Sequence, residues 1–413
     1  MRENIPRIDQ NWATQDAFVF ERHRAKMVRP LVYLPCLFML EFFCFVNSFI
    51  FDLKGASIDA GRFQDYAIEW VQSGRLEFVV DAAFYIQFLG VIYKFFGPNE
   101  FLGAQFGVIS LFVAAIYFEK ILLLFDVRRS YLWVIPFLLW PSLLPRATTT
   151  MREPYLIMFL VLISYNMMLF ELHKDPRKAI NALVLALVSA FFHKAFAVLL
   201  IFLLPYIIFV KMSSRLVFYR SKIFYVRVVI IVMLMLLIVK IVSDFSDVRG
   251  LQPFLALTSV DTEYMESVLA SKSSKDFRTT YDVILNFTSP LSFLISFFQV
   301  FIYYEFSPFP WMARTGYDIY ASLEGVFRFV GFVVLFNIWK NQKKPQYNIN
   351  TIIFLLFIIS AIWASGTVNY GTASRHHTTT NWIFLIAYAV GSAQATWPRI
   401  HFSKRVIKIG RND

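Results

Sequence analysis

Long apolar runs separated by short basic segments dominate the chain. A helix crosses the hydrocarbon core of a bilayer with roughly 20 apolar residues. Runs of this length or slightly shorter begin near Leu31, Phe101, Tyr131, Pro154, Ala179, Phe196, Val228, Ile319, Asn348 and Asn381. The pattern therefore predicts an all-α polytopic membrane protein with about ten transmembrane helices.

Two further apolar runs do not fit a regular span. Residues 82–97 form a short run that carries Lys94, and residues 291–306 lead into the proline-rich sequence PFPW. Backbone that does not cross the bilayer as a complete helix is tolerated there only where its polar groups face protein or water. We expect one or two interfacial or re-entrant helices at these positions.

The positions of the basic residues predict the orientation. If the N-terminus is cytoplasmic, the loops richest in Lys and Arg also lie in the cytoplasm, as the positive-inside rule requires. The expected organisation is a cytoplasmic segment 1–30, a transmembrane domain 31–397 and a basic cytoplasmic tail 398–413. Two long outer loops, 52–100 and 244–290, then face the periplasm or the exterior of a bacterial inner membrane. The first apolar run is long enough to span, so we interpret it as an uncleaved anchor.

Composition agrees with a lipid environment. Hydrophobic residues make up 58% of the 413 residues and aromatic residues 18%, which leaves too little polar surface for a soluble domain. The net charge of +12 resides in short loops between apolar runs, so it does not indicate a nucleic-acid partner. Cys36 and Cys44 both lie in the first apolar run and are interpreted as small hydrophobic residues.

The first outer loop contains an amphipathic pattern in IDAGRFQDYAIEWVQSG. Asp59, Phe63, Ala67, Trp70 and Gly74 follow one another at spacings of 4, 4, 3 and 4, which places them on one helical face. The pattern predicts a helix that starts at Asp59, where a carboxylate stabilises the helix N-terminus.

Asp59 could serve as a helix cap alone or as a catalytic base. A carboxylate at the membrane surface can take the proton from an acceptor hydroxyl as that hydroxyl attacks an anomeric carbon. Asp65 and Glu69 point elsewhere on the predicted helix and are expected to be solvated. Arg62, in the same segment, is a candidate for substrate binding.

Two short outer turns carry cations against the positive-inside rule. LPRATTTMREP contains Arg146, Arg152 and Glu153, and AFFHKAF contains His193 and Lys194. Such residues can reach lipid head groups, or they can bind a phosphate or diphosphate, for which arginine offers a bidentate fork. Glu153 is placed to orient Arg152.

The last outer turn, GTVNYGTASRHHTTTNW, is dense in polar residues. On an extended segment His376 and His377 would point in opposite directions, and no third ligand is close in sequence, so no metal site is expected. Asn369, Arg375 and His376, set among glycines, suit an anionic lipid-linked substrate better. Trp311 in PFPW is either an interfacial anchor or a platform for stacking a sugar.

Taken together, the Asp59 pattern, the REP and FHKAF turns, PFPW and NYGTASRHH resemble the GT-C superfamily of polytopic glycosyltransferases. That superfamily includes protein mannosyltransferase-like enzymes and many bacterial surface-polysaccharide polymerases. The resemblance implies an inverting transfer of a sugar or oligosaccharide unit from a polyprenyl phosphate or diphosphate donor to a surface glycan such as O-antigen, capsule or exopolysaccharide. Asp59 would occupy the position of the acidic residue that the family has after its first span.

The chain departs from the best-known members in two respects. Few residues follow the last expected span, and a single Asp stands where some members have an Asp-Glu pair. These departures leave open whether a divalent metal takes part and which acceptor is used. The partners implied are the lipid-linked donor, the glycan acceptor, membrane lipids and other polysaccharide assembly proteins.

A lipid-linked oligosaccharide flippase or transporter is the competing interpretation, and a non-catalytic scaffold of an export complex is a third. A flippase needs charged groups in the middle of the membrane. The candidates are Glu41, Arg328 and the neighbours Glu119 and Lys120, which we expect to pair with each other. The absence of an internal repeat in the sequence argues against a secondary transporter.

Overall fold

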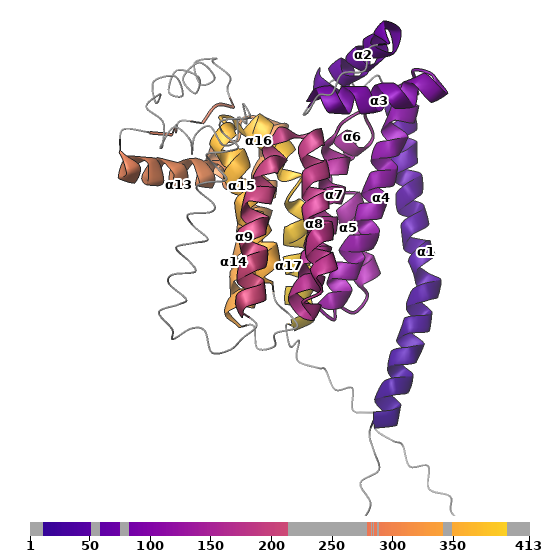
Figure 1. Cartoon of the computed structure of the whole chain (residues 1–413), viewed down its shortest axis with the longest axis vertical. Coiled ribbons are helices and arrows are strands. Elements are labelled where there is room, and N and C mark those ends of the chain that lie inside the picture. The colour runs from indigo at the N-terminus through magenta and orange to yellow at the C-terminus, as the bar shows by residue number, and fades with distance from the viewer. Residues whose placement is uncertain are drawn as a thin grey trace, which may run out of the picture.

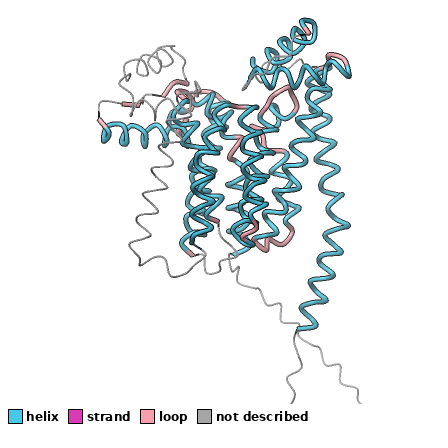
Figure 2. The backbone as a smooth tube through the Cα atoms, in the orientation of Figure 1, coloured by secondary structure: helices cyan, strands magenta, loops and turns pink. Residues whose placement is uncertain are grey.

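The computed structural model of the chain consists of helices packed along one another (Figures 1 and 2). It describes residues 11–50, 58–74, 82–213, 279–281, 283, 285–286, 289–341 and 349–394. Within these residues the β pairing is limited to one isolated bridge, between Thr280 and Asn369. The all-α prediction is therefore confirmed for the described part of the chain.

Among the described residues, five helical segments are long and apolar enough to cross a membrane: Val28–Phe49, Glu100–Leu124, Glu153–His173, Lys194–Lys211 and Gly316–Lys340. They agree with an α-helical membrane protein, but the expected count of about ten spans is not established. The long helices are α1 (Asn11–Phe49), α4 (Glu100–Leu124), α7 (Glu153–His173), α8 (Pro176–Phe192), α9 (Ala197–Ser213), α14 (Gly316–Lys340), α15 (Asn350–Gly366) and α17 (Asn381–Gln394). Because α1 begins at Asn11, the segment predicted as a polar N-terminal region is partly helical.

The centre of the bundle is formed by α17. Nearly every side chain from Trp382 to Val390 is buried, and the helix contacts α14, α4 and α5. A helix that is apolar on all sides is stable only when other helices surround it. Figure 1 shows α4, α7, α8, α9 and α14 running in the same general direction as α17, with α1 at one side.

The span predicted to begin near Tyr131 is not a continuous helix. It consists of a 3₁₀ turn η2 (Ser130–Trp133) and two short helices, α5 (Val134–Leu138) and α6 (Leu144–Ala147). Pro141 lies between α5 and α6, and a proline lacks the N–H that the helix needs. The expected span near Val228, most of the loop 244–290 and the tail 398–413 lie outside the described residues.

Three helices run across the direction of the bundle: α2 (Ile58–Ser73), α3 (Ala82–Phe96) and α13 (Pro290–Phe306), as Figure 1 shows. The first two pack together closely, because a Cβ on Gly90 would lie only 2.4 Å from the Trp70 ring. Much of the predicted outer loop 52–100 is thus a helical pair. The short helix α16 (Tyr370–His377) lies at the same end of the bundle as α2 and α3, and we call this end the α16 end.

Candidate functional site

The α16 helix begins at a cap that the sequence supplies locally. The Oδ1 atom of Asn369 accepts a hydrogen bond from the Thr372 N–H at 2.8 Å, and the Tyr370 hydroxyl donates to Asp318 Oδ1 on α14 at 3.0 Å. The extended conformation expected for this turn is therefore wrong, because the Asn369 cap starts a helix. Asn369, predicted to bind substrate, has a structural role here.

Arg375 on α16 joins two carboxylates from distant parts of the chain. Its Nε atom pairs with Glu153 Oε1 at the start of α7, and its Nη1 atom pairs with Asp59 Oδ2 in the first turn of α2. Burial opposes the positive charge of Arg375, but the two carboxylates outweigh it and raise the pKa of Arg375. Three residues singled out from sequence thus meet at one point.

The two carboxylates differ in their surroundings. The Asp59 side chain is 38% exposed, whereas that of Glu153 is 5% exposed. Arg152 and Arg146 also lie close enough to Glu153 to stabilise its charge. The Oε2 atom of Glu153 is buried and accepts no hydrogen bond from the described residues.

Arg152 and Arg146 hold defined positions beside this pair. Arg152 Nη1 donates to the Phe192 carbonyl at 3.2 Å, and its guanidinium carbon lies 5.7 Å from the centre of the Phe63 ring. Arg146 donates through Nη1 to the Ser142 carbonyl. Burial lowers the pKa of Arg146, and the charge of Glu153 opposes that effect.

His193 and His376 both contact the Trp363 ring. His376 stacks on Trp363 at 3.8 Å between ring centres, while His193 meets it edge-on at 4.8 Å. Burial lowers the pKa of each histidine well below its usual value, and the guanidinium groups of Arg152 and Arg375 add to the effect. Both imidazoles are therefore neutral near pH 7. Trp363, which no sequence pattern indicated, contacts both histidines.

The neutral form of His193 has its proton on Nε2. Its Nδ1 atom accepts a hydrogen bond from the Ala195 N–H at 3.2 Å, which is possible only when Nδ1 carries no proton. His376 Nδ1 lies 3.1 Å from the Thr367 hydroxyl. Each ring is held in position by a group from its own turn.

The N-terminal end of α2 is fixed over the start of α7. The Thr150 hydroxyl donates to the Ala60 carbonyl at 3.0 Å, and the buried Phe63 ring meets Tyr85 of α3 edge-on at 5.2 Å. These contacts place Asp59 next to Arg375. The amphipathic helix predicted from the Asp59 spacing is confirmed, with Phe63 and Ala67 on its buried face.

Other predicted site residues lie apart from this cluster. Arg62 is exposed on α2, and Lys194 is half-buried in η3 (Lys194–Phe196). Trp311, in η5 (Pro310–Met312), is 78% exposed and stacks on Phe309 at 4.9 Å. His377 points away from His376, and its Nε2 atom lies 2.7 Å from the Tyr304 carbonyl oxygen.

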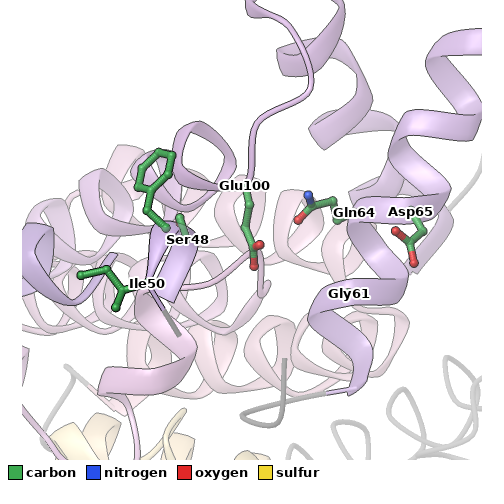
Figure 3. A pocket seen from close by; sticks show the side chains of 7 residues that line it. Ser48, Ile50, Gly61, Gln64, Asp65 and Glu100 are labelled. Carbon is green, nitrogen blue, oxygen red and sulfur yellow. The ribbon is translucent and has the colours of Figure 1, made fainter. Parts of the chain in front are cut away.

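A polar cavity of about 400 Å³ lies beside α2 (Figure 3). It is lined by Ser48, Phe49, Ile50, Gly61, Gln64, Asp65 and Glu100. Gly61 lies about 200° around the helix from Asp59, so α2 separates the cavity from Arg375. Its charged lining residues are both acidic, which makes it unsuitable for a phosphate group.

Comparison with known proteins gave no relative. No family model, no curated protein and no solved structure matches this chain. Function must therefore be argued from the geometry of the site. Among the described residues, no group of three or more His, Cys, Asp or Glu side chains is placed to hold a metal ion, and Cys36 and Cys44 are free and buried.

A second charged cluster lies inside the bundle. No sequence pattern predicted its contacts. Arg328, halfway along α14, pairs with Glu305 at the end of α13, and both side chains are fully buried. Arg328 Nη1 also donates to Thr380 Oγ1 at 3.1 Å and to Asn381 Oδ1 at 2.6 Å. A charged arginine is tolerated in the low-dielectric interior only when its N–H donors are hydrogen-bonded.

Glu324 connects this cluster to the α16 end. It accepts hydrogen bonds from Ser142 Oγ at 3.0 Å, from Trp140 Nε1 at 3.2 Å and from the Asn381 amide. The carbonyl of the same Ser142 accepts from Arg146. Polar groups thus continue from Arg146 through Glu324 to the buried Arg328 pair.

Two other mid-span charges, Glu119 and Lys120, have separate partners. Glu119 accepts from Arg29 Nε at 2.8 Å and from the Tyr33 hydroxyl at 2.9 Å, and Lys120 lies over the Tyr117 ring at 4.0 Å. The predicted pairing of Glu119 with Lys120 is therefore wrong. Neighbours on a helix point about 100° apart, so each side chain reaches a different surface.

Proposed function

We propose that the protein is a membrane glycosyltransferase whose active site is the Arg375 cluster. It would transfer a sugar or oligosaccharide unit from a polyprenyl phosphate or diphosphate to a surface-glycan acceptor, on the outer side of a bacterial inner membrane. The observation that carries the proposal is the meeting of Asp59, Glu153 and Arg375 beside Arg152 and Arg146. A carboxylate beside guanidinium groups is what such a transfer needs.

In the proposed reaction, Asp59 is the base. The acceptor oxygen attacks the anomeric carbon and gives its proton to the Asp59 carboxylate, while the bond from that carbon to the phosphate oxygen breaks. The bonding electrons leave with the phosphate, which departs as the polyprenyl phosphate or diphosphate. The partial exposure of Asp59 supports this role, because an acceptor hydroxyl must reach it.

The guanidinium groups would stabilise the charge that develops on the leaving phosphate. Arg375 offers its Nη atoms as a fork, and Arg152 and Arg146 add charge nearby. With three arginines and two carboxylates the cluster carries an excess positive charge, since His193 and His376 are neutral. His193, protonated on Nε2, would donate a hydrogen bond to a sugar or phosphate oxygen.

Reconstitution with a lipid-linked substrate tests the proposal. Lipid-linked oligosaccharides extracted from a strain that lacks the gene would be incubated with the purified protein in lipid vesicles, and the products sized by mass spectrometry. We expect transfer with the wild-type protein and a loss of 10²- to 10⁴-fold for Asp59→Asn, the range for removal of a general base. Products that grow by whole repeat units would identify a polymerase, and addition of one residue a single-sugar transferase.

Asp65→Asn is the matched control, because Asp65 lies on the same helix and is exposed on the face turned away from Arg375. It should transfer at the wild-type rate. If Asp59→Asn also keeps the wild-type rate in protein that is folded and membrane-inserted, Asp59 is not the base and the proposed mechanism fails.

A flippase is the second candidate, and the polar chain from Arg146 to the buried Arg328 pair favours it. Charged groups inside a bundle often mark a path for a polar substrate. Translocation of a fluorescent lipid-linked oligosaccharide across vesicles separates the two candidates. If translocation occurs without transfer and requires Glu41 or Glu324 but neither Asp59 nor Arg375, the flippase replaces the transferase.

A further inference from the structure

Arg375 is held by two ion pairs of unequal strength. The Glu153 side chain is only 5% exposed, and its charge is stabilised by two more arginines. The Asp59 pair involves a carboxylate that is 38% exposed to solvent. An exposed ion pair contributes little, whereas breaking a buried one leaves a desolvated charge. An anion that approaches Arg375 will therefore displace Asp59 and leave Glu153 in place.

The guanidinium group is also oriented for such an exchange. Glu153 uses Nε, Asp59 uses Nη1, and Nη2 donates to no group among the described residues. A phosphate binds arginine through two adjacent donors. A phosphate that takes both Nη1 and Nη2 competes with Asp59 for Nη1, while the Nε bond to Glu153 still fixes the side chain.

We propose that the Arg375–Asp59 pair is a latch which the diphosphate of the donor opens, so that the Asp59 oxygen held by Arg375 becomes available to act on the acceptor. The inference rests on the proposed function and adds an order of events: the donor binds first, and only then does the base become available. Without donor, the Asp59 oxygen is occupied by Arg375. A water or an acceptor that arrives alone therefore cannot use that oxygen as the base.

Binding of inorganic diphosphate to the purified protein in lipid nanodiscs, measured by calorimetry, tests the competition. Asp59→Asn removes the competing carboxylate, so we expect diphosphate to bind roughly two- to five-fold tighter, the range for an exposed ion pair. Asp65→Asn removes the same charge from the same helix without touching Arg375 and should have a clearly smaller effect. Equal effects of the two variants would mean that net charge alone acts, and would overturn the latch.

Chemical labelling of the wild-type protein gives a second measurement that does not depend on how the variants fold. A water-soluble carbodiimide with an amine labels accessible carboxylates, and peptide mass spectrometry gives the rate at each residue. We expect inorganic diphosphate to raise the labelling rate of Asp59 several-fold relative to Asp65, which also corrects for reagent consumed by diphosphate. An Asp59 rate that stays equal or falls relative to Asp65 would refute the latch.

These outcomes are separable from the proposed transfer, because neither measurement requires a sugar. Diphosphate-dependent labelling of Asp59 combined with full transfer by Asp59→Asn would keep the latch and reject Asp59 as the base. Loss of transfer in Asp59→Asn with no change in labelling or affinity would keep the base and reject the latch.

Discussion

Removing Arg328 should destabilise the protein more than removing any other arginine whose partners are described. Arg328→Leu would leave Glu305 fully buried, with its Oε2 atom deprived of the two guanidinium nitrogens that it accepts from. Breaking a buried ion pair from one side costs about 3–5 kcal/mol. Thr380 and Asn381 would lose a donor as well.

Replacing both members of the pair should be less harmful than replacing one. In the double variant Arg328→Leu, Glu305→Leu, no buried charge remains, and such replacements range from neutral to stabilising. The remaining cost is the lost donor to Thr380 and Asn381, about 1–3 kcal/mol for a buried polar group. The double variant should therefore lose much less stability than Arg328→Leu alone.

Thermal unfolding in detergent, followed by tryptophan fluorescence, measures the effect. At roughly 2–4 °C per kcal/mol, Arg328→Leu should lower Tm by about 6–20 °C. Arg29→Leu is the comparison, because Arg29 is 36% exposed and its partner Glu119 keeps hydrogen bonds from Tyr33 and Ser130, so its decrease in Tm should be clearly smaller. Equal decreases in Tm for Arg328→Leu and Arg29→Leu would refute the reasoning. So would a double variant that unfolds at a lower temperature than Arg328→Leu.

Three further predictions concern the α16 end. Arg375→Lys should weaken diphosphate binding by at least ten-fold in calorimetry, because a lysine cannot hold Glu153 and a phosphate fork at once. Thr150→Val should cost about 1 kcal/mol in thermal unfolding, because it removes the hydrogen bond to Ala60 without changing the shape of the side chain. The pKa of His193 and His376 is lowered in the folded protein, so below about pH 6.5 only the unfolded chain takes up their protons. Tm should therefore be constant above that pH and fall below it, and His376→Asn should flatten the fall.

Local patterns in the sequence predicted the elements of the site well. The Asp59 helix follows from the spacing of its apolar residues, and the turns bearing Arg152, His193 and Arg375 stand out because, in the predicted orientation, they carry cations against the positive-inside rule. These features depend on neighbours in sequence. That they meet at one end of the bundle follows from the alternation of the helices, but which carboxylate would pair with Arg375 does not.

The predictions that were wrong or missing share a physical cause. Each of these features depends on contacts between residues that are far apart in the sequence. Glu119 was expected to pair with its neighbour Lys120, yet it accepts from Arg29, 90 residues away. Trp363 gave no signal as part of an apolar helix, although it organises both histidines. Arg328 was recognised as a mid-span charge, but hydropathy cannot identify Glu305 as its partner.

The ion pairs of Arg328 in the interior and of Arg375 at the α16 end differ in burial, and therefore suit different roles. Arg328 and Glu305 are both fully buried, so exchanging either partner for a ligand would require desolvating a charge and opening the bundle. Arg375 keeps one buried partner and one exposed partner, which allows it to release Asp59 without losing its position. The first arrangement suits a fixed structural element. The second suits a group that can exchange one partner for a ligand and stay in place.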